Sequence, residues 1–597
     1  MARALALANG ELYVGLNQFG LVKTLHFPYV GHDNHTPHAV HKIGVWVDGQ
    51  ISWCDDSAWT HRSRYPIGAL VGHSVAVNEE LGVLLEFEDA VEADANVLIR
   101  NVHVVNLRDK QRNIRLFFHQ AFTIGGSVGL DTAQYVPADG TVLHYRGRRA
   151  FAIGGMTDVG QSFDQYAVGL FGEGLDGTWR DGEDGQLSMA AVECGQTDST
   201  IGFSLMIGGL SSRRVHYWLA ASTATRGAIQ LSRTLRKQGV YKRLGSTVDW
   251  WRKSLIPAFK VSDQLNPVYR KAFVDSLLGL RSHIDRRGAI IYDATDPTRS
   301  ICDPEVGALA LWPLIRLGYK QEAVHFFTFI RQALTEQGFV SLAYHGDGSL
   351  APTRLAYDGV RAPLRSSQTA VTLFIFSQLQ TLTKQPTLLR DFYVTLVVPM
   401  ANFLSEYVDE RGLPLSGIAS DGQTKESTSY TASLTYAALT AAAELADTSK
   451  DQDSAIRWRT AASTLREAAL KAFVGEDGTL RRSLDDETSD IASLYGAFMF
   501  GLIDMGHPAV AVTVERLERE ALSPLDKVFY APDGQIDYVG SLRMAQYYLE
   551  SGERDKAEAI VRRISRVITA ADTPHGQLTT WVYGEFINTL LDMLTRS

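Results

Sequence analysis

Two acidic side chains, Asp421 and Glu426, lie in a polar loop that directly precedes a predicted helix in the C-terminal half of the chain. The loop is rich in Gly, Ser and Asp, and small and apolar residues recur at spacings of two to four after residue 428, as in a buried helix. A carboxyl group can give or take a proton in a reaction, so this loop is a candidate for chemistry. Loop carboxylates also commonly cap helices or face water, and that alternative stays open.

Other acidic residues lie in similar positions before further predicted helices: Glu305, Asp537 and Asp572. Asp303, His345 and His575 also lie in polar loops and could together form a metal site. However, the chain has no HExxH motif and no paired-cysteine spacing, which are the patterns typical of metal sites. It also has no phosphate-binding glycine loop. We therefore expect neither a metal nor another cofactor.

Composition and charge exclude other functional classes. The 597 residues carry a net charge of −9, whereas binding to nucleic acid requires a basic face. The chain has no apolar run of about 18 residues, so no membrane span is predicted. Its three cysteines, Cys54, Cys194 and Cys302, are far apart. We expect buried free thiols in a cytoplasmic protein.

The elements that must position these residues fall into two groups. Residues 1–210 contain many short segments in which apolar and polar residues alternate, separated by Gly, Asn and Asp turns. This pattern predicts a two-sheet antiparallel β-sandwich. Residues 211–261 change from a strand to two amphipathic helices, and we interpret them as a linker between domains.

Residues 262–597 follow the helical period almost throughout and predict about a dozen helices joined by short loops. Several of these helices carry apolar residues on more than one side, as helices buried all round do. The number of helices suits two concentric rings of paired helices. In such a barrel, the loops at one end form a concave site.

Segments in both halves match one known family. In the first half they are NGELYVGLNQFG, HKIGVWVDGQISW, VLHYRGRRAF and GTWRDGEDGQLS. In the second half they are LIRLGYKQEAVHFF, GFVSLAYHGDGSL, LTYAALTAAAELA and SLRMAQYYLESGERDKAE. Over nearly its whole length the chain resembles glycoside hydrolase family 15, the glucoamylase family, in its bacterial and archaeal branch. The resemblance implies a multidomain β + α fold, with an N-terminal antiparallel β-sandwich followed by an (α/α)6 helical barrel.

The resemblance also implies an inverting glycosidase, which needs a carboxylic acid as proton donor and a carboxylate base ~6.5–9.5 Å away. The acid loop of the family aligns with residues 413–426 and places the acid at Gly422, which has no side chain. The region that holds the base in the family aligns with residues 571–578, which contain no Glu. Glu305 and Val306 replace an Arg-Asp pair that grips the sugar in the family.

Two hypotheses follow from these departures. The first is a glucoamylase-like protein of α-glucan or α-glucoside metabolism that does not hydrolyse its ligand, and instead binds carbohydrate or a protein partner. The second is an active, divergent α-glucoside hydrolase with relocated carboxylates. Its acid would be Asp421, Glu426 or Glu305, and its base Asp572 or Asp537.

An α-linked oligosaccharide or glucan is the ligand that the resemblance implies. Tyr344 and Tyr538 lie next to Gly-rich turns, and their rings could stack on a sugar. Arg365 and Asp537 could form hydrogen bonds with its hydroxyl groups.

Overall fold

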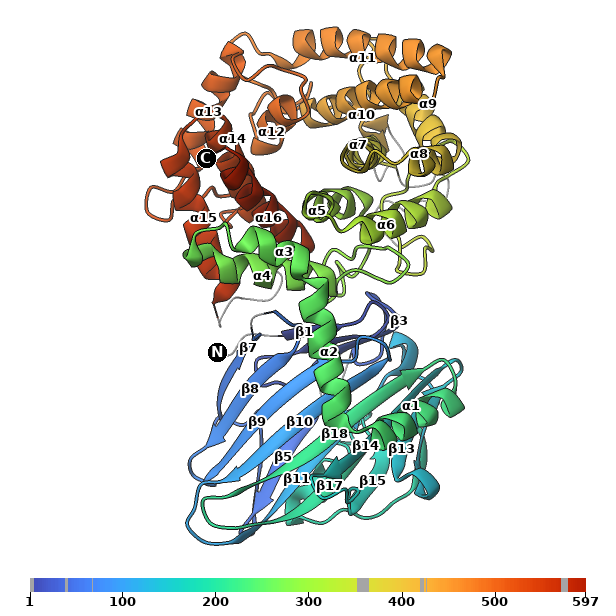
Figure 1. Cartoon of the computed structure of the whole chain (residues 1–597), viewed down its shortest axis with the longest axis vertical. Helices are drawn as coiled ribbons and strands as arrows, with labels where there is room; N and C mark the ends of the chain where they lie inside the picture. The colour runs from blue at the N-terminus through green and yellow to red at the C-terminus, as the bar shows by residue number, and fades with distance from the viewer. Residues whose placement is uncertain are drawn as a thin grey trace.

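The chain folds into a β-sandwich and a helical barrel that lie end to end, with one helix running between them (Figure 1). This computed structural model describes residues 5–37, 41–66, 68–351, 364–418, 424–425, 427–570 and 578–596. The fold class predicted from the sequence is confirmed.

Two large antiparallel sheets form the sandwich. The nine-stranded sheet contains, in spatial order, β16 (Val192–Gly195), β12 (Asp131–Val136), β13 (Thr141–Arg146), β14 (Arg149–Thr157), β18 (Ser212–Ser222), β10 (Val97–Asn106), β9 (Val83–Val91), β8 (Gly72–Asn78) and β7 (Thr60–Arg64). The five-stranded sheet contains β15 (Gln165–Leu170), β17 (Thr197–Ile207), β11 (Arg112–Ala121), β5 (Lys42–Val47) and β6 (Gln50–Trp53). Along β8, buried and half-buried side chains alternate strictly, as in a strand with one face on a core. The two sheets meet where Phe118 of β11 stacks on Tyr217 of β18, with ring centroids 4.7 Å apart.

A smaller four-stranded sheet lies where the sandwich meets the barrel. It contains β1 (Leu5–Ala8), β2 (Tyr13–Leu16), β3 (Val22–Tyr29) and β4 (His32–Asn34). β1 contacts α4 (Pro267–Ser282) of the barrel, and the ring of Tyr13 lies 5.5 Å from that of His283. One continuous apolar core therefore extends from the sandwich into the barrel.

Three helices connect the two parts: α1 (Thr225–Gln238), α2 (Val240–Ser254) and α3 (Ile256–Ser262). α1 packs on β18 and β14 of the sandwich, and α2 runs from the sandwich to the barrel (Figure 1). The predicted division at residues 210 and 261 stays a prediction. The last long strand, β18, lies within the predicted linker.

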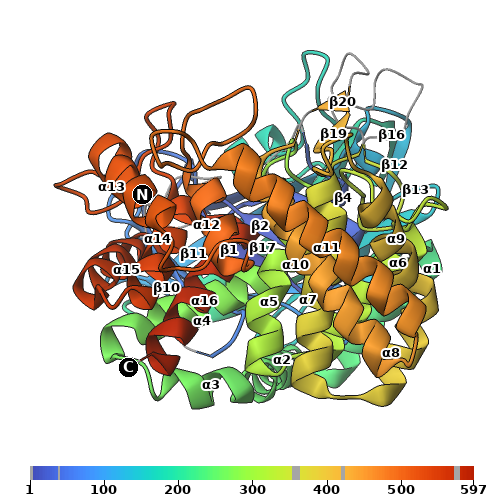
Figure 2. The same cartoon turned by 90° about the horizontal axis from the view of Figure 1, so that it is seen from above.

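In the described part of the chain, six helices form a closed inner ring in which each contacts the next: α5 (Pro304–Leu317), α7 (Ser366–Thr383), α10 (Ser429–Thr448), α12 (Ile491–Met499), α14 (Tyr538–Glu550) and α16 (Thr580–Thr595). An outer layer surrounds them (Figure 1): α4, α6 (Lys320–Ala333), α8 (Pro386–Phe392), α9 (Val398–Glu406), α11 (Gln452–Phe473), α13 (Pro508–Ala521) and α15 (Arg554–Thr569). Seen from above, α11 of this layer lies over α10 of the inner ring (Figure 2). A π-helical segment, Tyr393–Val397, joins α8 to α9.

Burial explains which helices lie inside. α5, α7, α10 and α16 bury most of their residues, because each packs against ring neighbours and an outer helix. α15 buries a single face, and its Arg, Lys and Glu residues lie on the other side, as in a surface helix. The apolar character on several sides of some predicted helices thus did indicate the inner ring.

One detail of the sequence interpretation is wrong. Cys54 and Cys302 are buried free thiols as predicted, but Cys194 is exposed. It lies on β16, the edge strand of the nine-stranded sheet, where side chains face solvent. Among the described residues, none of the helices is both long and apolar enough to cross a membrane.

Candidate functional site

The inner helices all begin at one end of the barrel, which we call the mouth. Outer and inner helices alternate along the chain, so the inner helices run in the same direction. Side chains at five of the six helix starts accept hydrogen bonds from free backbone N–H groups: Asp303, Thr428, Asp490, Asp537 and Thr579. Such caps satisfy groups that would otherwise lack partners. The sequence prediction that Thr428 or Ser429 caps its helix is confirmed for Thr428, which accepts from Thr431 N at 3.1 Å.

Near the mouth, polar side chains from all six inner helices meet around the barrel axis. We call this group the axial cluster: Glu305, Ser367, Tyr430, Tyr495, Arg543, Gln546, Trp581 and Glu585. Four of its members, Glu305, Ser367, Tyr430 and Trp581, are each the second residue of their helix. The direction of the helices and the ring closure therefore bring them together.

The centre of the axial cluster is a buried ion pair between Arg543 and Glu585, with side chains 4% and 2% exposed. Arg543 Nε lies 3.3 Å from Glu585 Oε1, and Gln546 Nε2 donates to Glu585 Oε2 at 3.0 Å. Trp581 Nε1 also donates to Glu585 Oε1, at 3.4 Å. Both carboxyl oxygens of Glu585 are thus in contact with donors from neighbouring side chains.

The guanidinium of Arg543 is also enclosed by aromatic rings. Its central carbon lies 4.3 Å from the ring centroid of Tyr495, 5.1 Å from that of Trp581 and 5.5 Å from that of Tyr430. A cation over aromatic faces is stabilised electrostatically. Burial by itself lowers the pKa of Arg543, but Tyr430 and Glu585 outweigh that effect, and its pKa is raised.

Tyr430 lies between the Arg543–Glu585 ion pair and Glu305, because it contacts Arg543 and interacts with Glu305. Glu305 is 6% exposed, and its Oε2 accepts a hydrogen bond from Ser367 Oγ at 2.7 Å. Burial, followed by the charge of Glu305, raises the pKa of Tyr430. Burial and then Glu305 also raise the pKa of Asp303. Glu305 therefore acts electrostatically on both the axial cluster and the cap of its own helix.

Among the predicted catalytic residues, the structure describes Glu305 and Asp537. Glu426, Asp421 and Asp572 lie outside the described residues, as does Gly422. Asp537 caps α14, because its Oδ1 accepts from Gly540 N at 2.7 Å. Burial raises its pKa. The interpretation of Asp537 as a capping residue, one of the alternatives that the sequence left open, agrees with this geometry.

The predicted sugar-binding residues occupy different environments. Arg365 is exposed at the start of α7, and its charge lowers the pKa of Asp303, so it lies at the mouth. Tyr538 is half-buried as the first residue of α14. Tyr344 is only 2% exposed, and its hydroxyl donates to Ala333 O and accepts from Ser341 N. The ring of Tyr344 thus faces packed protein.

Sequence reasoning missed Arg543, Glu585 and Ser367. The first two lie in segments that were interpreted as helical scaffold, SLRMAQYYL and TWVYGEFINTLLDML. A charged residue among apolar ones in a buried helix requires a partner, and that signal could have indicated them. No group of three or more His, Cys, Asp or Glu suited to a metal ion occurs among the described residues.

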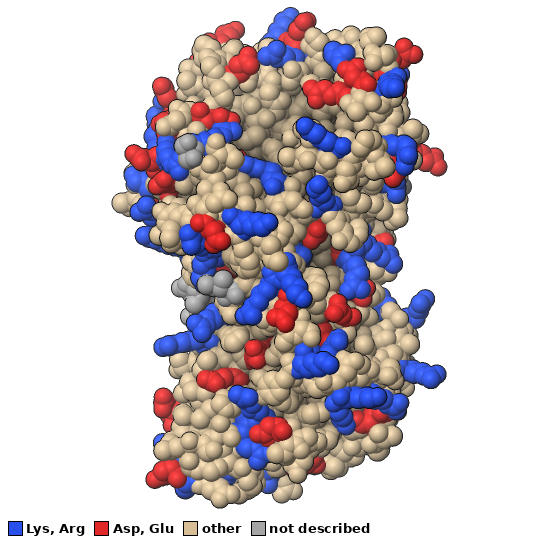
Figure 3. Space-filling view, in the orientation of Figure 1, with Lys and Arg blue, Asp and Glu red and all other residues tan. Residues whose placement is uncertain are grey.

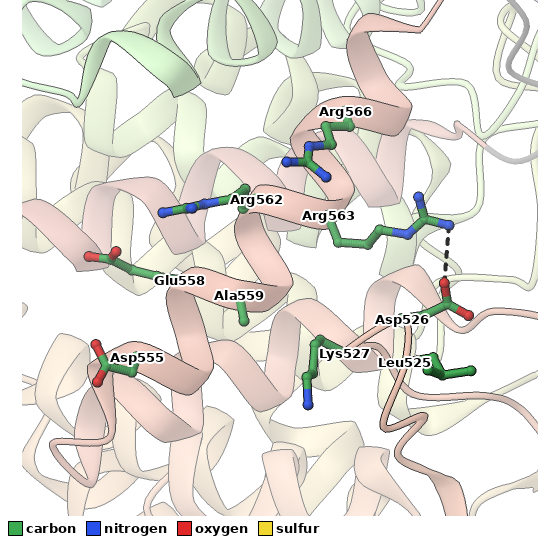
Figure 4. Close-up of a pocket in the computed structure, with 9 residues that line it drawn as sticks. All are labelled: Leu525, Asp526, Lys527, Asp555, Glu558, Ala559, Arg562, Arg563 and Arg566. Atoms are coloured by element: carbon green, nitrogen blue, oxygen red, sulfur yellow. Dashed lines mark ion pairs between the residues drawn. The ribbon is translucent and has the colours of Figure 1, made fainter.

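A separate cavity of about 520 Å³ lies on the outer side of the barrel, along α15. Arg562, Arg563 and Arg566 line it, and Arg563 reaches Asp526 on the loop before α14 (Figure 4), with 3.5 Å between the charged atoms. On the face of the molecule in Figure 3, side chains of both charges are interspersed. None of the residues that line the cavity on α15 belongs to the axial cluster.

Comparisons with known proteins bear on the fold as a whole. No protein-family model matches the chain. An uncharacterized glycosyl hydrolase of Methanocaldococcus jannaschii is 27% identical over 148 residues, which is 25% of this chain and 23% of that relative. The crystal structure of a bacterial glucoamylase complexed with acarbose superposes with a TM-score of 0.77 and 13% identity, and the match covers 100% of this chain and 96% of that one. The arrangement of sandwich and barrel is therefore that of the glucoamylase-like proteins that the sequence resembles.

Proposed function

We propose that this chain is a glucoamylase-like protein that binds an α-linked oligosaccharide or glucan at the barrel mouth and does not hydrolyse it. The fold shared with a glucoamylase that was crystallised with acarbose supports a saccharide ligand. The matched segment of a glycosyl hydrolase supports the same class.

One observation carries the loss of hydrolysis. The buried carboxylate of Glu585 is neutralised by Arg543 and accepts hydrogen bonds from Gln546 and Trp581. An inverting glycosidase needs a carboxyl group that is free to donate a proton to the bound sugar, whereas both carboxyl oxygens of Glu585 are held by neighbouring side chains. Asp537 is committed to a helix cap. The sequence adds a glycine at the position of the family acid, Gly422.

Residues at the mouth are still suited to holding a sugar. Arg365 is exposed and carries several N–H donors for hydroxyl groups. Tyr538 offers a half-buried ring at the start of α14. Asp537 has a second carboxylate oxygen besides the one that caps the helix. We propose Arg365, Tyr538 and Asp537 as the binding residues and leave out Tyr344, whose ring is enclosed.

The test combines an activity assay with a binding assay on the full chain. We expect no glucose to be released from maltose, isomaltose, trehalose or starch. We expect heat of binding with acarbose in isothermal titration calorimetry, at least tenfold weaker in Arg365→Ala. Arg390→Ala, which changes an exposed arginine on the outer helix α8, is the matched control. If glucose is released and the release disappears when a barrel carboxylate is replaced, the proposal that the protein does not hydrolyse its ligand is wrong. If acarbose does not bind, the proposal of a saccharide ligand at the mouth is wrong.

A second candidate function is an active hydrolase in which Glu305 is the acid. Its specific support is the position of Glu305, a buried carboxyl group near the mouth that is oriented by a hydrogen bond from Ser367, because a general acid must be held in place to donate its proton. This alternative predicts turnover that is lost in Glu305→Gln and kept in Glu558→Gln, which changes a half-buried residue of the outer helix α15.

A further inference from the structure

A cleft of about 670 Å³ lies where the sandwich meets the barrel. The sandwich contributes His26 at β3, His32 and Asp33 of β4, and Gly126 of the short helical turn Ile124–Gly126. The barrel contributes His345 and the loop of residues 294–301 that leads to α5. Its volume is within the range of small-molecule sites, which often occur between domains.

Two histidines from the two parts of the molecule stack on each other in this cleft. The rings of His32 and His345 are 4.4 Å apart at 14°, and Tyr29 extends the stack at 6.2 Å from His32. The guanidinium of Arg287 lies over the ring of Tyr29 at 4.7 Å. The stack fixes the two imidazoles, so their nitrogen atoms have defined positions.

Two ring nitrogens in the cleft, Nδ1 of His26 and Nδ1 of His345, have no hydrogen-bond partner within the described part of the chain. Nδ1 of His32 lies 3.8 Å from Asp347 Oδ2, and Nε2 of His32 lies 3.5 Å from Asp33 Oδ1. His26 is 3% exposed, and its other nitrogen, Nε2, bonds to Ala294 O at 3.0 Å. A buried polar atom without a partner destabilises the structure, because it has lost its hydrogen bonds to water. Ligand hydroxyl groups that enter the cleft could supply such partners.

The charge of the cleft indicates what kind of ligand fits. Burial lowers the pKa of His26 to about 4, and burial followed by His32 lowers the pKa of His345. Both rings are therefore neutral at pH 7, and a neutral imidazole has one donor and one acceptor, as a hydroxyl group does. The carboxylate of Asp33 is paired with Arg149. Pro37, Pro297 and Ile301 add apolar surface, which suits the C–H faces of a sugar ring.

We propose that this cleft is a second binding site, for a short neutral saccharide, lined by residues other than those proposed to bind sugar at the barrel mouth. The unpartnered nitrogens, the stacked imidazoles, the carboxylates of Asp33 and Asp347 beside them and the partly apolar lining all favour a neutral polyhydroxylated ligand. The proposal takes its ligand from the chemistry of the cleft and does not require the mouth to bind sugar.

The experiment is isothermal titration calorimetry with maltose at pH 7, together with saturation-transfer NMR, on the full chain. His345→Phe keeps a ring in the stack and removes both nitrogens, and His345→Ala removes the ring as well. We expect both variants to weaken one binding event at least tenfold. The matched control is His103→Ala on the outer face of the sandwich, where His103 contacts Glu86 and Ser212. We expect it to bind as the unmodified chain does.

The outcomes separate this proposal from the function proposed for the mouth. Maltose binding that is weakened in His345→Phe but not in Arg365→Ala supports the cleft and counts against the mouth. Binding that is weakened only in Arg365→Ala overturns the cleft and supports the mouth. Two binding events, each sensitive to one variant, support both sites. The absence of any maltose binding overturns the cleft. Circular dichroism of each variant tests whether it folds. If His345→Ala does not fold, the result for His345→Phe decides between the outcomes.

Discussion

The buried ion pair between Arg543 and Glu585 gives the sharpest test of the axial cluster. The two side chains are 4% and 2% exposed, so replacing either one leaves the other as a buried charge without its counter-ion. Breaking a buried ion pair in this way costs about 3–5 kcal/mol. We expect Arg543→Met and Glu585→Leu each to lower the free energy of unfolding of the barrel by that amount.

The double variant Arg543→Met/Glu585→Leu separates the pair from its surroundings. Because it removes both charges, no uncompensated ion remains, and replacing a buried pair by apolar residues is often close to neutral. We expect the double variant to lose less stability than the sum of the two single variants, with a difference of at least about 2 kcal/mol.

The assay is urea denaturation followed by far-ultraviolet circular dichroism, whose helical signal comes mainly from the barrel. The control is the pair Arg554–Glu558 on α15, which has a similar separation of 3.2 Å but side chains 43% and 34% exposed. Arg554→Met should cost at most about 1 kcal/mol. Additive losses in the double variant, or equal losses at the two pairs, would refute the view that Arg543 and Glu585 form a desolvated pair.

Two further predictions concern the loop between α4 and α5. Burial raises the pKa of Asp285 from 3.8 to about 7, so the folded state favours the protonated form. The stability from this group is present below pH ~4 and is lost as the pH rises toward 7. The free energy of unfolding should therefore fall by up to about 4 kcal/mol across that window, and Asp285→Asn should flatten the pH profile. An unchanged profile would contradict this assignment. A Cβ on Gly288 (φ +109°) would lie 2.2 Å from His325 O, whereas at Gly318 (φ +91°) no described atom lies within 4 Å. Gly288→Ala should thus lower the stability by about 1–3 kcal/mol more than Gly318→Ala in thermal unfolding, and equal losses would show that the loop moves aside.

Much of the architecture could be predicted from local patterns. The alternation of residues along β8 indicates a strand with one buried face. The apolar residues on several sides of α7 and α16 indicate helices that are buried on all sides. Capping side chains such as Thr428 and Asp537 mark helix starts in the sequence itself. These signals are local, so they do not depend on which helix becomes the neighbour of which. Tyr344 shows where local patterns fail. The Gly-rich turn beside it predicted an accessible ring, whereas the side chain is buried.

The sequence alone determined that the chain has a sandwich and a helical barrel, and its resemblance to glucoamylases predicts that Gly422 aligns with the acid of that family. Only the tertiary structure decided which polar residues meet. Glu305 and Glu585 come from helices at opposite ends of the barrel segment, and they enter one cluster because the ring closes between α5 and α16. His32 and His345 meet because the small sheet of the sandwich packs against the barrel loops. A periodic pattern shows which face of an element is buried, but not its partner, and the partner determines the charge, the pKa and the chemistry of the site.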